Sequence, residues 1–166
     1  MSKIGTLGPR NTNSEFSAVY YLQQKNIEGE VVLFDTPELS IDALINNYVD
    51  KAILCVVYPA LNEIVFRNLE SIEITELFHF HTDNMVIASS GEGGSACSHP
   101  APKHLLKNQY DQFSYVNSNS EAAKKVAAGE FNKCVTTKSA AIENNLDIIH
   151  DYGKVPMGWA VFERKH

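Results

Sequence analysis

The chain has 166 residues, of which 44% are hydrophobic and 20% are charged, and its formal net charge at pH 7 is −6. These values are ordinary for a globular protein of one domain or two small lobes. The acidic balance, without a stripe of Lys and Arg between aromatic residues, argues against a nucleic-acid surface. No run of about 18 apolar residues could cross a membrane, and the N-terminus lacks the apolar core of a signal peptide. We therefore expect a cytoplasmic protein with no nucleic-acid and no membrane partner.

The first part of the chain alternates between strand and helix patterns. Residues 4–7 and 31–34 are short apolar runs that indicate strands, and residues 14–25 between them have a helical pattern. We expect the buried side of this helix to carry Phe16, Val19, Tyr20 and Leu22. Thr36 and Pro37 predict the start of a second helix, as its N-cap and its first helical residue. The apolar residues of the second helix have mixed spacings that leave its buried face open: Leu39, Ile41, Leu44 and Ile45.

Three further strands are predicted before the middle of the chain. Residues 52–57 form a continuous apolar run, which is typical of a strand covered on both faces. Two more strands are expected at 71–80 and 84–88. Residues 89–96 are the only glycine-rich segment, and we interpret them as a flexible loop or as a crossing between two lobes.

The second half of the chain continues the alternation. Its predicted elements are a helix at 100–109, a strand at 113–116, a helix at 120–128 ended by Gly129, a strand at 133–136, a helix at 138–144, and short strands near Ile148 and Ala160. Alternation of this kind indicates α/β architecture with largely parallel sheets. The glycine-rich segment suits a division into two lobes.

Three segments place small polar residues directly before a predicted helix: 8–14, 98–102 and 117–120. A helix N-terminus presents unpaired N–H groups and a partial positive charge, so it can hold a carboxylate without a cation. Further donors at these turns are the hydroxyls of Thr12, Ser14, Ser118 and Ser120. Three such turns at the carboxyl edge of a sheet would suit a small dicarboxylate. For any single turn, helix capping explains the same residues.

The cysteine and histidine residues do not predict a metal centre. Cys55, Cys97 and Cys134 are far apart and contain no Cys-x-x-Cys pair, so we expect neither a zinc cluster nor a disulfide framework. His79 and His81 share a strand face and could bind a metal, but without a third ligand we interpret them as a surface or packed pair. We predict no metal and no cofactor.

Two other residues have open interpretations. His99, before Pro100, could donate a proton or orient its turn. Trp159, the only tryptophan, could be a core anchor or a wall over a substrate ring. Glu15, in the first turn of the first helix, is interpreted as a residue that offsets the helix dipole.

Four motifs, in order along the chain, resemble those of the prephenate dehydratase domain. They are Gly8-Pro9 with Thr12 and Ser14, Val57-Tyr-Pro59 with Asn62, Ser98-His-Pro100, and Ser118-Asn-Ser-Glu-Ala-Ala123. The resemblance covers residues 4 to about 164. It implies a two-lobe fold of the type II periplasmic-binding-protein kind, mostly parallel sheets with flanking helices, and a ligand between the lobes. We expect a single catalytic domain over 1–166, with lobe 1 at about 1–80 plus 153–166, lobe 2 at about 81–152, and no ACT domain.

The chain departs from the dehydratase pattern at positions associated with loss of the ring hydroxyl. Dehydratases have an Asn-x-Thr-Arg-Phe motif and a Gln directly after His-Pro. Met157 stands here at the place of that Thr, Gly158 at the place of the Arg, and Ala101 at the place of the Gln. These forms are similar to the prephenate decarboxylases of bacilysin-type pathways. The resemblance therefore implies decarboxylation of prephenate without aromatisation and without a cofactor, giving a dihydro-4-hydroxyphenylpyruvate for antibiotic or other secondary-metabolite biosynthesis.

The resemblance also implies which residues form the site. We predict Asn62 and Thr12 as catalytic residues, with Asn62 near the 4-hydroxyl. Substrate binding is predicted for Ser14, Ser98, Ser118, Asn119, Ser120, Met157, Gly158 and Trp159. The expected partner is the small molecule prephenate, with a homodimer as one option for assembly. Two other functions stay open: a non-catalytic module that binds a small carboxylate, and a divergent prephenate dehydratase.

Overall fold

The chain divides into two compact units. Unit 1 contains Met1–Thr82 together with the segment that begins at Pro156, and unit 2 is Asp83–Val155. The computed structural model describes residues 1–106, 110 and 112–165. Within the described residues, no helix is long and apolar enough to span a membrane.

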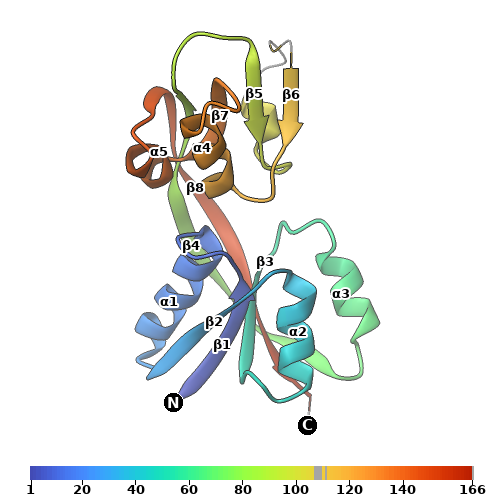
Figure 1. The fold of residues 1–166 in the computed structure, drawn as a ribbon. Coiled ribbons are helices and arrows are strands. Elements are labelled where there is room, and N and C mark those ends of the chain that lie inside the picture. Colours follow the sequence, from blue (N-terminus) through green and yellow to red (C-terminus); the bar gives the residue numbers. More distant parts are fainter. Residues whose placement is uncertain (107–109, 111, 166) are drawn as a thin grey trace. The chain divides into compact units, whose positions relative to one another are not determined.

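The chain passes between the units inside two long strands. These are β4 (Ile72–Ser89) and β8 (Asp147–Arg164), each of 18 residues (Figure 1). The sequence predicted two separate strands in place of each, and both predicted breaks are wrong. At the expected break in β4, the Asp83 carboxylate accepts a hydrogen bond from the Ser139 backbone N–H at 2.9 Å. A polar residue whose hydrogen bonds are made in this way does not need to end a strand.

Unit 1 contains a sheet in the order β2-β1-β3-β8-β4. β1 (Ser2–Leu7) pairs in parallel with β2 (Gly29–Phe34) and with β3 (Lys51–Cys55). β8 runs antiparallel to β3, with Trp159 opposite Cys55. The first three strands expected in this unit are confirmed, although the third ends at Cys55 because residues 56 and 57 form a turn.

Helices cover both faces of this sheet. α1 (Asn13–Lys25) lies on one face, and α2 (Pro37–Ile45) and α3 (Leu61–Arg67) lie on the other (Figure 1). Successive side chains of a strand point to opposite faces, so β8 contributes Trp159 to the core under α1 and Phe162 to the core under α2 and α3. Burial on both faces explains why these strands are continuous apolar runs in the sequence.

The buried side of α1 differs from the predicted one. Phe16 and Val19, which were expected to be buried, are each 37% exposed, and Tyr20 is half-buried. The residues that face the sheet are Ser17, Ala18, Tyr21 and Leu22. Only Leu22 is shared with the prediction. The small side chains at positions 17 and 18 let the helix backbone lie close to the sheet, which leaves the bulky Phe16 at the margin.

The start of α2 confirms the prediction. Thr36 is the N-cap, its Oγ1 accepts a hydrogen bond from the Leu39 N–H at 3.2 Å, and Pro37 is the first helical residue. Ile41 and Leu44 are buried, whereas Leu39 is 46% exposed. The sequence pattern did not decide which face of α2 is buried, and the structure shows that it is the face with Ile41 and Leu44.

Unit 2 contains a sheet in the order β8-β4-β7-β5-β6. β5 (Ser95–Ser98) pairs in parallel with β6 (Gln112–Tyr115) and β7 (Lys133–Thr137), and β7 runs antiparallel to β4. α4 (Asn119–Ala127) and α5 (Lys138–Glu143) pack on one face of the sheet. The sequence predicted β6, β7, α4 and α5 in these places. The prediction of α/β architecture with flanking helices is confirmed in both units, and the strands are mixed, because β8 runs antiparallel to β3 and β7 runs antiparallel to β4.

Two predictions for unit 2 need correction. Of the two interpretations of the glycine-rich residues 89–96, a loop is right and a crossing between lobes is wrong, because residues 90–94 join β4 to β5 inside unit 2. The helix expected at 100–109 is only a short 3₁₀ helix, η1 (Lys103–Leu106), and residues 107–109 lie outside the described residues. Pro100 and Pro102 have no N–H to donate, which limits helix formation at the start of this segment.

Asp151 provides a test of acid stability in unit 2. Its carboxylate accepts hydrogen bonds from Lys138 Nζ at 2.9 Å, the Gly153 N–H at 2.8 Å and Asn84 Nδ2 at 3.0 Å. The bond from Lys138, followed by those from Gly153 and Asn84, lowers the pKa of Asp151 to about 2. A lowered pKa stabilises the fold above the ordinary pKa of an aspartate, and this stabilisation is lost as the pH falls toward the folded value.

We expect Asp151→Asn to be less stable than the wild type at pH 5, and the difference in free energy of unfolding to shrink as the pH falls from 4 to 2. Urea unfolding at a series of pH values measures it. Asp147→Asn is the control, because Asp147 is an exposed carboxylate of the same strand without a partner among the described residues. A difference that stays constant down to pH 2 would contradict the prediction.

Candidate active site

The turn before α1 in unit 1 is a helix cap closed by its own glutamate. Thr12 is the N-cap, and its Oγ1 accepts a hydrogen bond from the Glu15 N–H at 3.4 Å. The Glu15 carboxylate accepts one from the Asn11 N–H at 2.6 Å. Asn11 has φ 64°, a left-handed conformation that asparagine tolerates better than most residues. Asparagine can therefore form this turn without a glycine.

The turn before α4 in unit 2 has the same design. Ser118 is the N-cap, and its Oγ accepts a hydrogen bond from the Glu121 N–H at 3.1 Å. The Glu121 carboxylate accepts one from the Asn117 N–H at 2.9 Å. The sequence itself carries a signal for this equivalence. Residues 11–15 read Asn-Thr-Asn-Ser-Glu, and residues 117–121 read Asn-Ser-Asn-Ser-Glu.

In both turns, one hydroxyl caps the helix and the next serine hydroxyl remains available as a donor. Thr12 and Ser118 are confirmed as caps, and the carboxylates of Glu15 and Glu121 offset the positive ends of the two helices. The next serine in each turn is different. Ser14 and Ser120 are half-buried, and within the described residues neither hydroxyl has a hydrogen-bond partner. Each turn therefore offers one serine hydroxyl to a ligand.

Ser98 lies beside the second of these turns. It ends β5, and its backbone carbonyl accepts a hydrogen bond from the Val116 N–H at 3.1 Å, one residue before Asn117. Ser98 is fully buried, and its hydroxyl donates to the His99 carbonyl at 2.8 Å. The hydroxyl therefore shapes the turn, and the structure brings Ser98, Ser118, Asn119 and Ser120 together at the carboxyl edge of β5 and β6.

Asn119 and His99 complete this edge of unit 2. The Asn119 side-chain oxygen is buried and has no hydrogen-bond partner among the described residues, while its backbone carbonyl accepts from Thr136 Oγ1 at 2.7 Å. Burial lowers the pKa of His99, so its imidazole is neutral at pH 7. His99 Nδ1 accepts a hydrogen bond from the Ala101 N–H at 3.3 Å, which places the ring proton on Nε2. This bond favours the interpretation that His99 orients the turn.

In unit 1, Gly158 packs directly against the turn that follows β3. The Val56 N–H donates to the Gly158 carbonyl at 3.0 Å. A Cβ added to Gly158 would lie 2.9 Å from Val56 Cγ2, which is closer than real Cβ contacts. A side chain at position 158 would therefore displace Val56. Asn62 is exposed in α3, whose N-cap, Ala60, makes no side-chain hydrogen bond.

Met157 and Trp159 belong to the core under α1. Met157 is partly buried against the same cluster as Trp159, which also contains Ile4, Ala18, Tyr21, Leu22, Ile53 and Val161. Trp159 is 2% exposed, which favours its interpretation as a core anchor. Its Nε1 has no hydrogen-bond partner among the described residues.

The predicted histidine pair does not extend to a larger ligand set. The rings of His79 and His81 lie 5.0 Å apart, edge to face. Among the described residues, no group of three or more His, Cys, Asp or Glu side chains could hold a metal ion. Cys97 and Cys134 are buried on paired strands and Cys55 is half-buried, and all three are free thiols.

Solved structures share the fold of this chain. A prephenate dehydratase from Arthrobacter aurescens is similar with a TM-score of 0.70 and 12% identity, over 99% of this chain and 60% of that chain. A prephenate dehydratase from Staphylococcus aureus has a TM-score of 0.68 and 13% identity, over 100% of this chain and 67% of that one. The BvgS periplasmic VFT2 domain of Bordetella pertussis has a TM-score of 0.60 and 18% identity, over 98% of this chain and 80% of that one. At these identities the likeness shows the fold alone, and it confirms the fold that the sequence motifs implied.

Curated relatives are closer in sequence. No family model matches the chain. The prephenate decarboxylase of Planktothrix agardhii is 31% identical over 98% of this chain and 88% of that protein. The prephenate decarboxylase of Bacillus subtilis strain 168 is 24% identical over 96% of this chain and 85% of that protein. Since the identity to the first extends over nearly the full length of both proteins, the chain belongs to the prephenate decarboxylase family.

Proposed function

We propose that this protein is a cofactor-independent carboxy-lyase that removes carbon dioxide from prephenate and leaves the ring non-aromatic. The observation that carries the proposal is the near full-length similarity to prephenate decarboxylases, which shows that the chain belongs to their family. The product would be a dihydro-4-hydroxyphenylpyruvate for antibiotic or other secondary-metabolite biosynthesis. A cytoplasmic location and a homodimer stay predictions.

The free serine hydroxyls support a substrate with more than one carboxylate. Prephenate carries a ring carboxylate and a pyruvyl carboxylate. We propose that the hydroxyls of Ser14 and Ser120 each donate a hydrogen bond to a carboxylate, because each is half-buried, has no partner among the described residues and lies in the first turn of a helix. In this proposal Thr12 and Ser118 act mainly by fixing the two turns.

The chemistry must expel one leaving group and retain another. Decarboxylation breaks the bond between the ring carbon and its carboxylate, the electron pair enters the ring diene, and a proton is added at a ring carbon. If the 4-hydroxyl left as well, the ring would become aromatic. An acid at that hydroxyl would promote its departure, and Met157 and Ala101 are apolar residues where dehydratases have Thr and Gln. Asn62, a neutral amide, is proposed to lie near the hydroxyl without providing an acid.

Incubation of the purified protein with prephenate, followed by proton NMR, tests the proposal. We expect prephenate to disappear while alkene and carbinol signals of a non-aromatic product grow, with a protein-free sample as control. Aromatic phenylpyruvate signals would identify a divergent dehydratase instead. Unchanged prephenate together with measurable binding would identify a non-catalytic module that binds carboxylates.

A further inference from the structure

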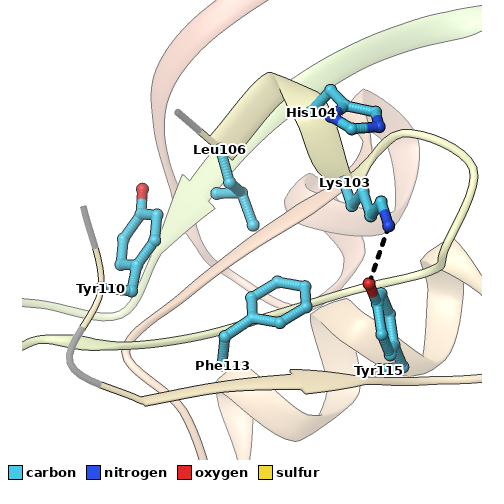
Figure 2. Close-up of a pocket in the computed structure, with 6 residues that line it drawn as sticks. All are labelled: Lys103, His104, Leu106, Tyr110, Phe113 and Tyr115. Atoms are coloured by element: carbon cyan, nitrogen blue, oxygen red, sulfur yellow. Dashed lines mark hydrogen bonds between the residues drawn. The ribbon is translucent and has the colours of Figure 1, made fainter. Parts of the chain in front are cut away.

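A pocket of about 400 Å³ lies within unit 2, and none of its residues belongs to the predicted substrate site. Figure 2 shows the side chains that line it, which are Lys103, His104, Leu106, Tyr110, Phe113 and Tyr115. Val116 packs in the core under α4. Because side chains alternate along a strand, Phe113 and Tyr115 of β6 point to the opposite face, where Leu106 of η1 is also packed. The pocket therefore lies on the face of the sheet away from α4.

Four of the six lining side chains are aromatic or aliphatic, and the other two are Lys103 and His104. The rings of Phe113 and Tyr115 meet edge to face with their centroids 5.1 Å apart. Leu106 is 3% exposed, whereas Phe113 is 39% and Tyr115 is 56% exposed. Two aromatic side chains so exposed beside a cavity offer a surface on which another ring can pack.

One cation stands at the side of the pocket. Lys103 Nζ donates a hydrogen bond to the Tyr115 hydroxyl oxygen at 3.0 Å and lies 5.4 Å from the centre of the Tyr115 ring. Within the described part of the chain, Lys103 forms no ion pair with a carboxylate, and the Tyr115 hydroxyl proton has no acceptor. The ammonium group and the phenol proton can therefore both be directed to one incoming anion.

We propose that this pocket binds an aromatic monocarboxylate. The ring of the ligand packs against Phe113, Leu106 and Tyr110, and its carboxylate accepts hydrogen bonds from Lys103 and Tyr115. A volume of about 400 Å³ suits a ring with a short acidic side chain. A phosphate or a dicarboxylate would fit less well, because the lining provides one lysine and no arginine, and four of its six side chains are aromatic or aliphatic.

Three simple ligands test the two halves of this recognition. 3-Phenylpropanoate has the ring and the charge, 3-phenylpropan-1-ol has the ring alone, and propanoate has the charge alone. In titrations of the full chain without prephenate, we expect 3-phenylpropanoate to bind at least tenfold more tightly than either of the others. Amide shifts in ¹⁵N NMR spectra should be largest at Leu106, Phe113 and Tyr115. Equal binding of the alcohol, equal binding of propanoate, or shifts centred on Ser120 would overturn the proposal.

Variants separate this pocket from the substrate site. Lys103→Met keeps the apolar stem over Tyr115 and should weaken 3-phenylpropanoate binding about tenfold, while prephenate turnover stays within twofold of wild type. Lys124→Met, at an exposed lysine of α4, is the matched control and should leave binding unchanged. Phe113→Ser should weaken binding through the other half of the site. If Lys103→Met left binding unchanged, or reduced prephenate turnover tenfold, the proposal would be wrong. Far-ultraviolet circular dichroism confirms that each variant is folded.

Discussion

Replacing Ser120 by alanine is expected to lower kcat/KM for prephenate by about ten- to a hundredfold and to leave the free energy of unfolding nearly unchanged. The hydroxyl of Ser120 has no partner among the described residues, so its removal leaves no protein group unpaired. A hydrogen bond to a charged group contributes about 1.5–3 kcal/mol, which corresponds to that range of activity. Steady-state kinetics and urea unfolding measure the two effects. Ser14→Ala, at the equivalent position of unit 1, should behave alike.

Helix caps provide the matched controls for this prediction. Ser118→Ala removes a cap and should lower the free energy of unfolding by about 1 kcal/mol. Thr137 is the N-cap of α5, and its Oγ1 accepts a hydrogen bond from the Ala140 N–H at 3.3 Å. Thr137 is not among the residues of the proposed site, so Thr137→Ala removes a cap elsewhere. It should have a similar cost in stability, with turnover within twofold of wild type. If Ser120→Ala lost stability like a cap variant and kept its turnover, Ser120 would have no role in binding.

Trp159→Ala is expected to lower the free energy of unfolding by about 3–5 kcal/mol, because it leaves a large cavity in the core under α1. Trp159 is 2% exposed and is among the largest fully buried side chains. Since it is the only tryptophan, unfolding in urea has to be followed by circular dichroism.

Trp159→Phe separates packing from substrate contact. It keeps most of the apolar volume and removes a buried N–H that has no partner among the described residues, so we expect a smaller loss of stability than for alanine. Turnover of prephenate should stay within a few-fold of wild type. A folded Trp159→Phe protein that lost turnover by more than tenfold would show that the indole N–H, or the ring itself, contacts the substrate.

Local signals in the sequence predicted much of the fold. Thr36 followed by Pro37 identified the start of α2 because capping depends on neighbouring residues alone. The buried face of α1 depends on what packs against the helix. There the small residues Ser17 and Ala18 face the sheet, whereas hydrophobicity alone pointed to Phe16 and Val19. Tertiary packing overrode the local preference.

The site was predicted less completely, because residues of one type in one turn have different roles. Ser118 and Ser120 look equivalent in the sequence, but only the hydroxyl of Ser118 is used by the helix cap. Hydrogen-bond partners make this distinction, and composition does not contain them. The repeated five-residue segment at 11–15 and 117–121 was the available signal, since it suggested that two turns share one design.

The long strand β8 also limits how this protein can change in length. In unit 1, its odd-numbered residues such as Trp159 pack under α1 and its even-numbered residues such as Phe162 pack under α2 and α3. Inserting or deleting one residue between Trp159 and Phe162 would turn the side chains that follow the change to the opposite face of the sheet, and each core would receive side chains shaped for the other. A change of two residues would preserve the alternation. Length variation within this strand should therefore be tolerated only in even steps, whereas the loop between β4 and β5 has no such parity.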